Sequence, residues 1–172
     1  MYRTVPYIIL FFIVALLQIF LFDNLSISVY LCPLVYIGFI VLLPIDVPPI
    51  TVLLSALAMS VAMDWAMGAV GVNTIATLPV AMLRQPLLQS ICGKEGIREG
   101  GIPSPIRLGR GAFLRYLVTM VLVHHLLFFV MEALSWTQLF QILIRLVVSG
   151  AVSVGFIWLL ARLFTTKLTA RL

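Results

Sequence analysis

The chain has 172 residues, of which 63% are hydrophobic and 10% are charged, with a net charge of +5 and a mean hydropathy of +1.19. Soluble domains are about 45–50% apolar, and a globule of this size lacks the interior volume to bury the excess. The composition therefore excludes a soluble domain and predicts an all-α, polytopic integral membrane protein whose apolar side chains face lipid.

Six segments are predicted as transmembrane helices, since a helix needs about 20 apolar residues to cross the hydrocarbon. The first, 5–22, is too long for the core of a signal peptide, and no small-residue cleavage site follows it. The second covers 26–43, with Pro33 near its start, where a missing N–H is tolerated. The others are predicted at 50–67, 70–83, 116–134 and 139–164, and the six form a single membrane domain over 1–172.

The long polar connection 84–115 decides the orientation. Its glycines and prolines argue against a long helix there. Lys and Arg accumulate on the cytoplasmic side of membrane proteins, and with the N-terminus inside, every Lys and Arg except Arg145 falls on that side. This predicts cytoplasmic termini, a cytoplasmic loop 84–115 lying against anionic lipid headgroups, and a true crossing by the short span 70–83.

The loop is not expected to bind a nucleotide or nucleic acid. Its stretch GKEGIREGG (93–101) lacks the spacing of a phosphate-binding loop, because Leu88 stands where that motif needs glycine and Glu95 where it needs Ser or Thr.

Small or polar residues recur every four positions in the third span, which places Ala56, Ser60, Asp64 and Gly68 on one helix ridge. Such ridges let a neighbouring helix approach closely. Near the outer end of the span, Asp64 is predicted to cap the backbone of the next segment or to pair with a cation; a proton or substrate site is the alternative. Gly68 and Gly71 permit a sharp reversal, so Asp64 is expected to lock a helical hairpin.

The last span contains a basic residue deep in the membrane and two pairs of small residues. Arg145 is predicted to form an ion pair with either Glu132 or Asp64. The small pairs, four residues apart, support helix contact within the molecule or with the membrane anchor of a partner, and they are Ser149 with Ser153 and Ala151 with Gly155.

No catalytic residue, cofactor or metal site is predicted. His124 and His125 point about 100° apart on a helix, and although His125 shares a face with Glu132, two ligands do not complete a zinc site. Packing or an interhelical hydrogen bond is the expected role of the histidines. The sequence contains neither a nucleophile-elbow nor a zinc-protease motif.

Three segments of the first half resemble the family of the bacterial rod shape-determining protein MreD. They are LLQIFLFDNL (16–25), CPLVYIGFIVLLP (32–44) and MDWAMGAVGVNTIATLPVAMLRQPLL (63–88). The likeness is carried by Leu17-Gln18, by Pro33 and by Asp64 followed by Gly68 and Gly71. Where this family often has glycines upstream of its aspartate, this chain has Ala56 and Ser60; its last two spans agree in hydropathy and length alone.

The resemblance implies a non-catalytic inner-membrane component of the cell-elongation machinery. It implies association with the single-pass protein MreC, with the MreB filament, and with the peptidoglycan synthase pair RodA and penicillin-binding protein 2. It also implies a fold similar to the substrate-binding subunits of energy-coupling-factor vitamin transporters. A small-molecule binding subunit is therefore the alternative function, with a polar pocket expected around Asp64, Asn73 and Glu132; a flippase-like enzyme is a weaker third reading.

Overall fold

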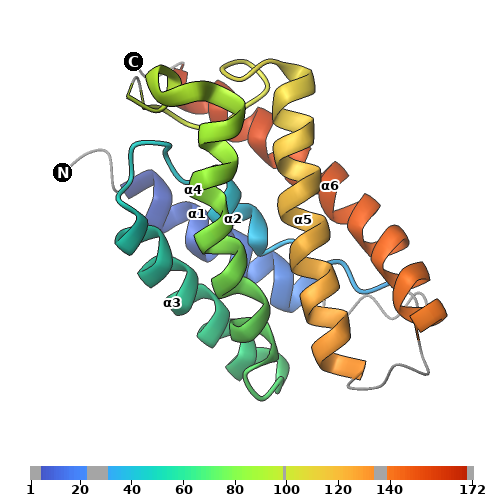
Figure 1. The fold of residues 1–172 in the computed structure, drawn as a ribbon. Coiled ribbons are helices and arrows are strands. Elements are labelled where there is room, and N and C mark those ends of the chain that lie inside the picture. The colour runs from blue at the N-terminus through green and yellow to red at the C-terminus, as the bar shows by residue number, and fades with distance from the viewer. Residues whose placement is uncertain (1–4, 23–30, 99, 134–138, 170–172) are drawn as a thin grey trace.

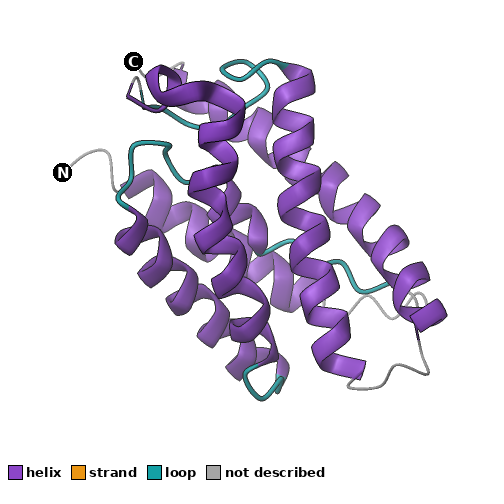
Figure 2. Ribbon diagram, viewed as in Figure 1, coloured by secondary structure: helices purple, strands orange, loops and turns teal. Residues whose placement is uncertain are grey.

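The computed structural model describes residues 5–22, 31–98, 100–133 and 139–169, and every regular element in these ranges is a helix. Figures 1 and 2 show how the helices are arranged. In chain order they are α1 (Val5–Leu16), its π-helical continuation η1 (Leu17–Phe22), α2 (Ile37–Leu42), α3 (Pro49–Met67), α4 (Val72–Arg98), α5 (Arg110–Ala133) and α6 (Leu139–Thr169).

Four of the helical segments are long and apolar enough to cross a membrane. They are Val5–Phe22, Pro49–Met67, Arg110–Ala133 and Leu139–Thr165. Their outer faces expose large apolar side chains along their length, among them Phe12, Leu54, Leu126 and Val147. An apolar surface of this extent needs lipid around it, so the chain is a helical membrane protein, as its composition predicts.

The short helix α2 lies at the centre of the bundle. The helices α3, α4, α5 and α6 pack side by side in chain order, and α1 packs against α3. All residues of α2 are buried, and it contacts α1, α3, α4, α5 and α6. In Figure 1 it lies behind α4 and α5. Protein, not lipid, therefore surrounds α2.

Gly38 of α2 lies against Ile157 of α6. A Cβ atom added there would lie 3.0 Å from Cγ1 of Ile157, so any larger residue would require the Ile157 side chain to shift. The sequence analysis did not single out this residue.

The predicted continuous helix 26–43 is wrong in the part that the structure describes. Residues 31–36 are not helical, and α2 covers only 37–42; residues 26–30 lie outside the described residues. Pro33 has no N–H to donate and disfavours the helical conformation in Cys32 before it. Hydropathy counts apolar side chains and does not register whether the backbone between them is helical.

The fourth helix is longer than the predicted span 70–83, and the prediction that 84–115 is all loop is wrong over 84–98 and over 110–115, where α5 has already begun. The helix α4 continues through Pro79 and Pro86 to Arg98, with a local break at Gly93, where φ is 68°. Packing against α3 and α5 outweighs the weak helix propensities on which the prediction rested. Figure 1 shows α4 starting at the end where α3 finishes and finishing at the end where α5 starts.

Candidate functional site

The non-helical segment 31–36 lies in the interior and receives its hydrogen bonds from distant side chains. Gln18, which is 1% exposed, donates from Nε2 to the carbonyl of Pro33 (3.2 Å) and accepts at Oε1 from the N–H groups of Val35 (2.7 Å) and Tyr36 (3.3 Å). Irregular backbone at membrane depth is tolerated only where protein or water satisfies it. Gln18 thus supplies what a preceding helical turn would have supplied.

A second set of side chains, from α5 and α6, holds the same segment. The Ser149 hydroxyl accepts the N–H of Cys32 (2.9 Å), and Nε2 of His125 accepts the N–H of Leu34 (3.3 Å). His125 Nδ1 lies 2.9 Å from the carbonyl of Val121, which requires a proton on Nδ1. Nε2 is then an acceptor.

Ser153 completes the arrangement, because its hydroxyl lies 3.0 Å from the acceptor Nε2 of His125. Both ring nitrogens of His125 are therefore engaged, so this histidine offers no free metal ligand. Within the part of the chain that the structure describes, no group of three or more His, Cys, Asp or Glu residues could hold a metal ion.

The carbonyls at the other end of α2 are satisfied in the same manner. Tyr116 donates its hydroxyl to the carbonyl of Val41 (3.2 Å), and Nη2 of Arg84 donates to the carbonyls of Leu43 and Pro44, the latter at 3.0 Å. Both ends of α2 are thus bonded to side chains of other helices, which a helix of this length needs when it is removed from water.

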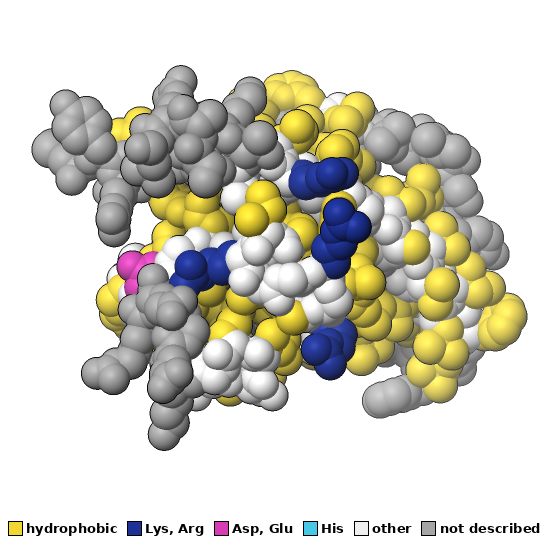
Figure 3. All heavy atoms as spheres, turned by 90° about the horizontal axis from the view of Figure 1, so that it is seen from above, with side chains coloured by type: hydrophobic (Ala, Val, Ile, Leu, Met, Phe, Trp, Pro, Cys, Tyr) yellow, Lys and Arg dark blue, Asp and Glu magenta, His cyan; other side chains and the backbone are white. Residues whose placement is uncertain are grey.

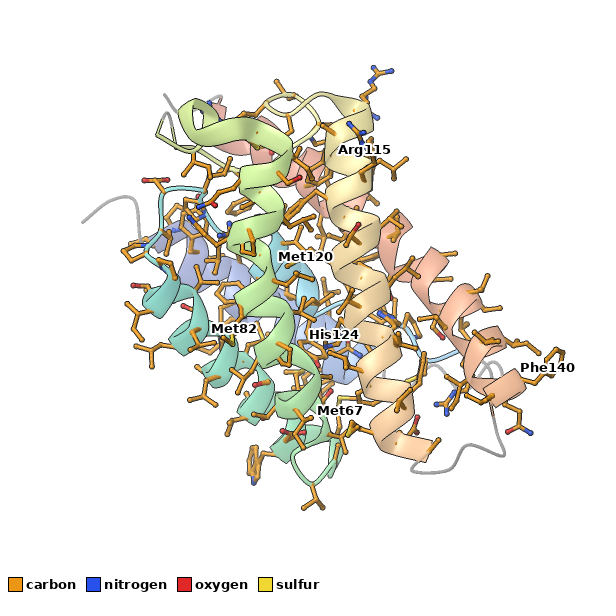
Figure 4. The ribbon with its side chains drawn as sticks, viewed as in Figure 1. Met67, Met82, Arg115, Met120, His124 and Phe140 are labelled. Carbon is orange, nitrogen blue, oxygen red and sulfur yellow. The ribbon has the colours of Figure 1, made fainter. Side chains whose placement is uncertain are left out.

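Four polar side chains meet in the core between α2, α4 and α5. The hydroxyl of Tyr36 lies 2.9 Å from Oδ1 of Asn73, 3.1 Å from the hydroxyl of Thr77 and 2.8 Å from Nε2 of His124. All four residues are buried, and Figure 4 shows His124 on the side of α5 that faces α4. Tyr36 donates its single proton to Asn73, so His124 Nε2 is the donor here and its buried Nδ1 is an acceptor without a partner.

Asp64 caps the helix that follows it, which is one of the roles predicted for it. Oδ1 of its carboxylate accepts the N–H of Asn73 (2.9 Å), and Oδ2 accepts both the N–H (3.1 Å) and the hydroxyl (2.5 Å) of Thr74. Gly68 and Gly71 have φ angles of 65° and 81°, a region that favours glycine. The hairpin lock inferred from the sequence is confirmed.

The predicted ion pair of Arg145 forms with Glu132 and not with Asp64. Nη1 of Arg145 lies 2.8 Å from Oε2 of Glu132, and its guanidinium carbon lies 4.5 Å from the centre of the Phe129 ring. The pair joins the end of α5 to the start of α6.

The residues predicted to pack helices together divide into two groups. Ser60, Ser149 and Ser153 are fully buried. Gly68, Gly71 and Gly155 differ, because a Cβ atom added to any of them would meet nothing within 4 Å. The first two are needed for the turn, and Gly155 faces outward from α6.

Basic side chains gather at the end of the bundle where α4 finishes and α5 starts, as the view from above in Figure 3 shows. The exposed basic residues of the described chain there are Arg107, Arg110, Arg115 and Arg162. Trp65, which is 89% exposed, lies near the opposite end, close to the Met67 labelled in Figure 4. Exposed tryptophan is typical of membrane–water interfaces.

The sequence analysis did not identify Gln18 as the hydrogen-bonding partner of residues 33–36, nor Arg84 as the residue that caps the end of α2. The available signal for Gln18 was a single strongly polar residue in an otherwise apolar run, whereas Arg84, next to Gln85, stands at the start of the predicted polar connection. Comparison of the chain with protein-family models, curated proteins and solved structures finds no match.

Proposed function

We propose that the protein is a non-catalytic scaffold of the bacterial cell-elongation machinery, which binds the transmembrane helix of a single-pass protein of the MreC type in the inner membrane. The choice of this machinery rests on the resemblance of residues 16–25, 32–44 and 63–88 to the MreD family. What supports a binding role without chemistry is the way the buried polar groups are used: they bond to one another and to the broken second segment.

The observation that carries the proposal is the division of the small residues of α6 between its two faces. Ser149 and Ser153 point inward and hold the fold, whereas Ala151 and Gly155 are exposed. Small residues four apart on an open helix face permit a second helix to pack closely. We therefore assign the outer face of α6 around Ala151 and Gly155 as the docking face for the partner helix.

The orientation within this proposal follows the basic residues. The end that carries Arg107, Arg110, Arg115 and Arg162 faces the cytoplasm, where it is available to the MreB filament. The synthase pair RodA and penicillin-binding protein 2 is reached through the membrane-embedded partner.

Impermeant maleimide labelling of single cysteines tests this orientation, in a chain carrying Cys32→Ser and Cys92→Ser. Val70 is 97% exposed and Ile106 is 73% exposed, at opposite ends of the bundle. We expect Val70→Cys to react in intact spheroplasts and Ile106→Cys to react only after permeabilisation. The reverse pattern contradicts the proposed orientation.

The docking face is tested by substitutions that leave the fold unchanged. Because a Cβ atom at Gly155 meets nothing within the chain, Gly155→Leu should accumulate normally and yet lose co-purification with the MreC-type partner by about tenfold. The matched control is Val61→Leu, on an exposed position of α3, which should retain the complex. Retention by Gly155→Leu, or equal loss by both, contradicts the assignment.

Depletion in cells tests the wider role. The scaffold proposal requires that depleted cells lose rod shape and insert new wall material without order. Cells of normal shape would overturn it.

The alternative function is a small-molecule binding subunit of a transporter, and one observation favours it. The core cluster of Tyr36, Asn73, Thr77 and His124 places convergent polar groups in the membrane interior, and Nδ1 of His124 has no partner. Against it, the acids expected around the pocket are engaged elsewhere, Asp64 at the start of α4 and Glu132 at Arg145. Calorimetric titration with a vitamin panel decides: saturable binding lost in Tyr36→Phe supports transport.

A further inference from the structure

Arg84 is a buried cation without a countercharge among the described residues. Its side chain is 1% exposed, and Nη2 donates to the carbonyls of Leu43 and Pro44. Nε and Nη1 are buried and have no partner, and no described acid forms an ion pair with Arg84. Burying a guanidinium is costly unless an anion compensates it. Something of negative charge is therefore expected beside Arg84.

A cavity of about 310 Å³ adjoins this side chain, between the first turns of α3 and the middle of α4. Arg84 and Gln85 contribute its polar wall, and of the Gln85 side chain only the Nε2–H group can donate to an anion, since Oε1 is an acceptor. The rest of the lining is apolar and is made of Pro49, Ile50, Val52, Leu53, Ala81 and Met82. The cavity thus has one cationic side and one side suited to hydrocarbon.

The position of the cavity along the membrane fits a lipid headgroup. The helix α3 has 19 residues, which at 1.5 Å per residue is about 28 Å, close to the thickness of the hydrocarbon core. Its first residue, Pro49, therefore lies at the interface, on the same side as the basic end of the bundle. The positive end of the α3 dipole faces the cavity and adds to the attraction for an anion.

The apolar wall identifies the kind of anion. Met82 is 68% exposed and Ile50 is 63% exposed, and both line the cavity. These side chains form an open path from the cavity to the surrounding bilayer. Inorganic phosphate would leave them without contact, whereas a phospholipid fills both sides of the cavity.

We propose that this cavity binds one anionic phospholipid, with its phosphate at Arg84 and Gln85 and an acyl chain along Leu53 and Met82. The site differs from the lipid contact expected of the basic surface, since it is a cavity at the α3–α4 junction with a fixed occupant. It is independent of the scaffold role.

Native mass spectrometry of the full-length protein tests the site, with phosphatidylglycerol and phosphatidylcholine as probes. We expect one retained phosphatidylglycerol per chain, at least tenfold above phosphatidylcholine at equal concentration. Leu53→Trp, which fills the cavity and leaves the guanidinium in place, should reduce retention about tenfold. Arg115→Gln, which removes an exposed charge from the same end of the bundle, should leave it unchanged.

Three outcomes of these retention measurements overturn the proposal. They are equal retention of the two lipids, unaltered retention by Leu53→Trp, and equal loss in Arg115→Gln, which would indicate diffuse attraction to the basic surface. Arg84→Gln is a second variant, expected to lose the preference for phosphatidylglycerol, but its cap on α2 makes misfolding a possible result; Leu53→Trp then decides. Displacement of the lipid by millimolar inorganic phosphate would identify a free-phosphate site and also overturn the lipid assignment.

Discussion

Replacing Gln18 by leucine tests whether one side chain holds the broken second segment in place. The substitution keeps the size of the buried residue and removes three hydrogen bonds, those to Pro33, Val35 and Tyr36. Polar interactions between membrane helices average about 0.6 kcal/mol each, which gives about 2 kcal/mol. Backbone groups left buried without a partner cost about 1–3 kcal/mol each. The first figure is the lower bound, so we expect the free energy of unfolding to fall by at least about 2 kcal/mol.

The measurement is unfolding by SDS in mixed micelles, followed by circular dichroism. Gln141→Leu is the matched control, because Gln141 is exposed on α6; its free energy of unfolding should change by less than about 0.5 kcal/mol. Hydrogen exchange adds a local readout: the amides of Val35 and Tyr36 should exchange faster in Gln18→Leu. If the free energy of unfolding and the exchange rates of both amides match those of the unsubstituted protein, the hydrogen bonds of Gln18 do not hold residues 31–36 in place.

Three further substitutions test the other contacts. Asp64→Ala removes the acceptors at the start of α4 and should lower the free energy of unfolding by about 1–2 kcal/mol, with Asp64→Asn intermediate; equal values for both variants would contradict capping. Arg145→Glu alone should reduce accumulation in membranes measured by immunoblot, and adding Glu132→Arg should restore it; normal accumulation of the single variant would refute the ion pair. Gly38→Ala places a Cβ atom 3.0 Å from the Ile157 side chain and should lower the free energy of unfolding by about 1–3 kcal/mol. Adding Ile157→Ala to this variant should recover part of the loss. An unchanged free energy of unfolding in Gly38→Ala would show that the contact is not tight.

Features that depend on local sequence were predictable. The start and end of α3 follow from the Pro48-Pro49 pair and from Gly68, and the cap by Asp64 follows from an acid placed before a glycine turn. The expected depth of Arg145 in the membrane limited its partner to Glu132 or Asp64, and in the structure the partner is Glu132. In each case the partners lie within about a dozen residues of each other.

The break before α2 could not be predicted from Pro33 alone, because the side chains that stabilise the non-helical backbone are remote. Gln18 lies 15 residues before Pro33, and Ser149 lies 117 residues after Cys32. The hydropathy of residues 32–43 is the same whether they form a short buried helix or part of a helix that crosses the membrane. The length of α4 was missed for the opposite reason: Pro79 and Pro86 are strong local signals that contacts with the neighbouring helices override, whereas Gly93 does interrupt the helix.

The dependence of residues 31–36 on distant side chains has a consequence for synthesis of the chain at the ribosome. The N–H of Cys32 reaches its acceptor on Ser149 only after a further 117 residues have been made, which at about 5–20 residues per second takes roughly 6–23 s. During that interval the segment has the bonds from Gln18 but not those from α5 and α6. Because backbone groups without partners are costly at membrane depth, we expect residues 31–36 to reach their final position only after α6 has been inserted.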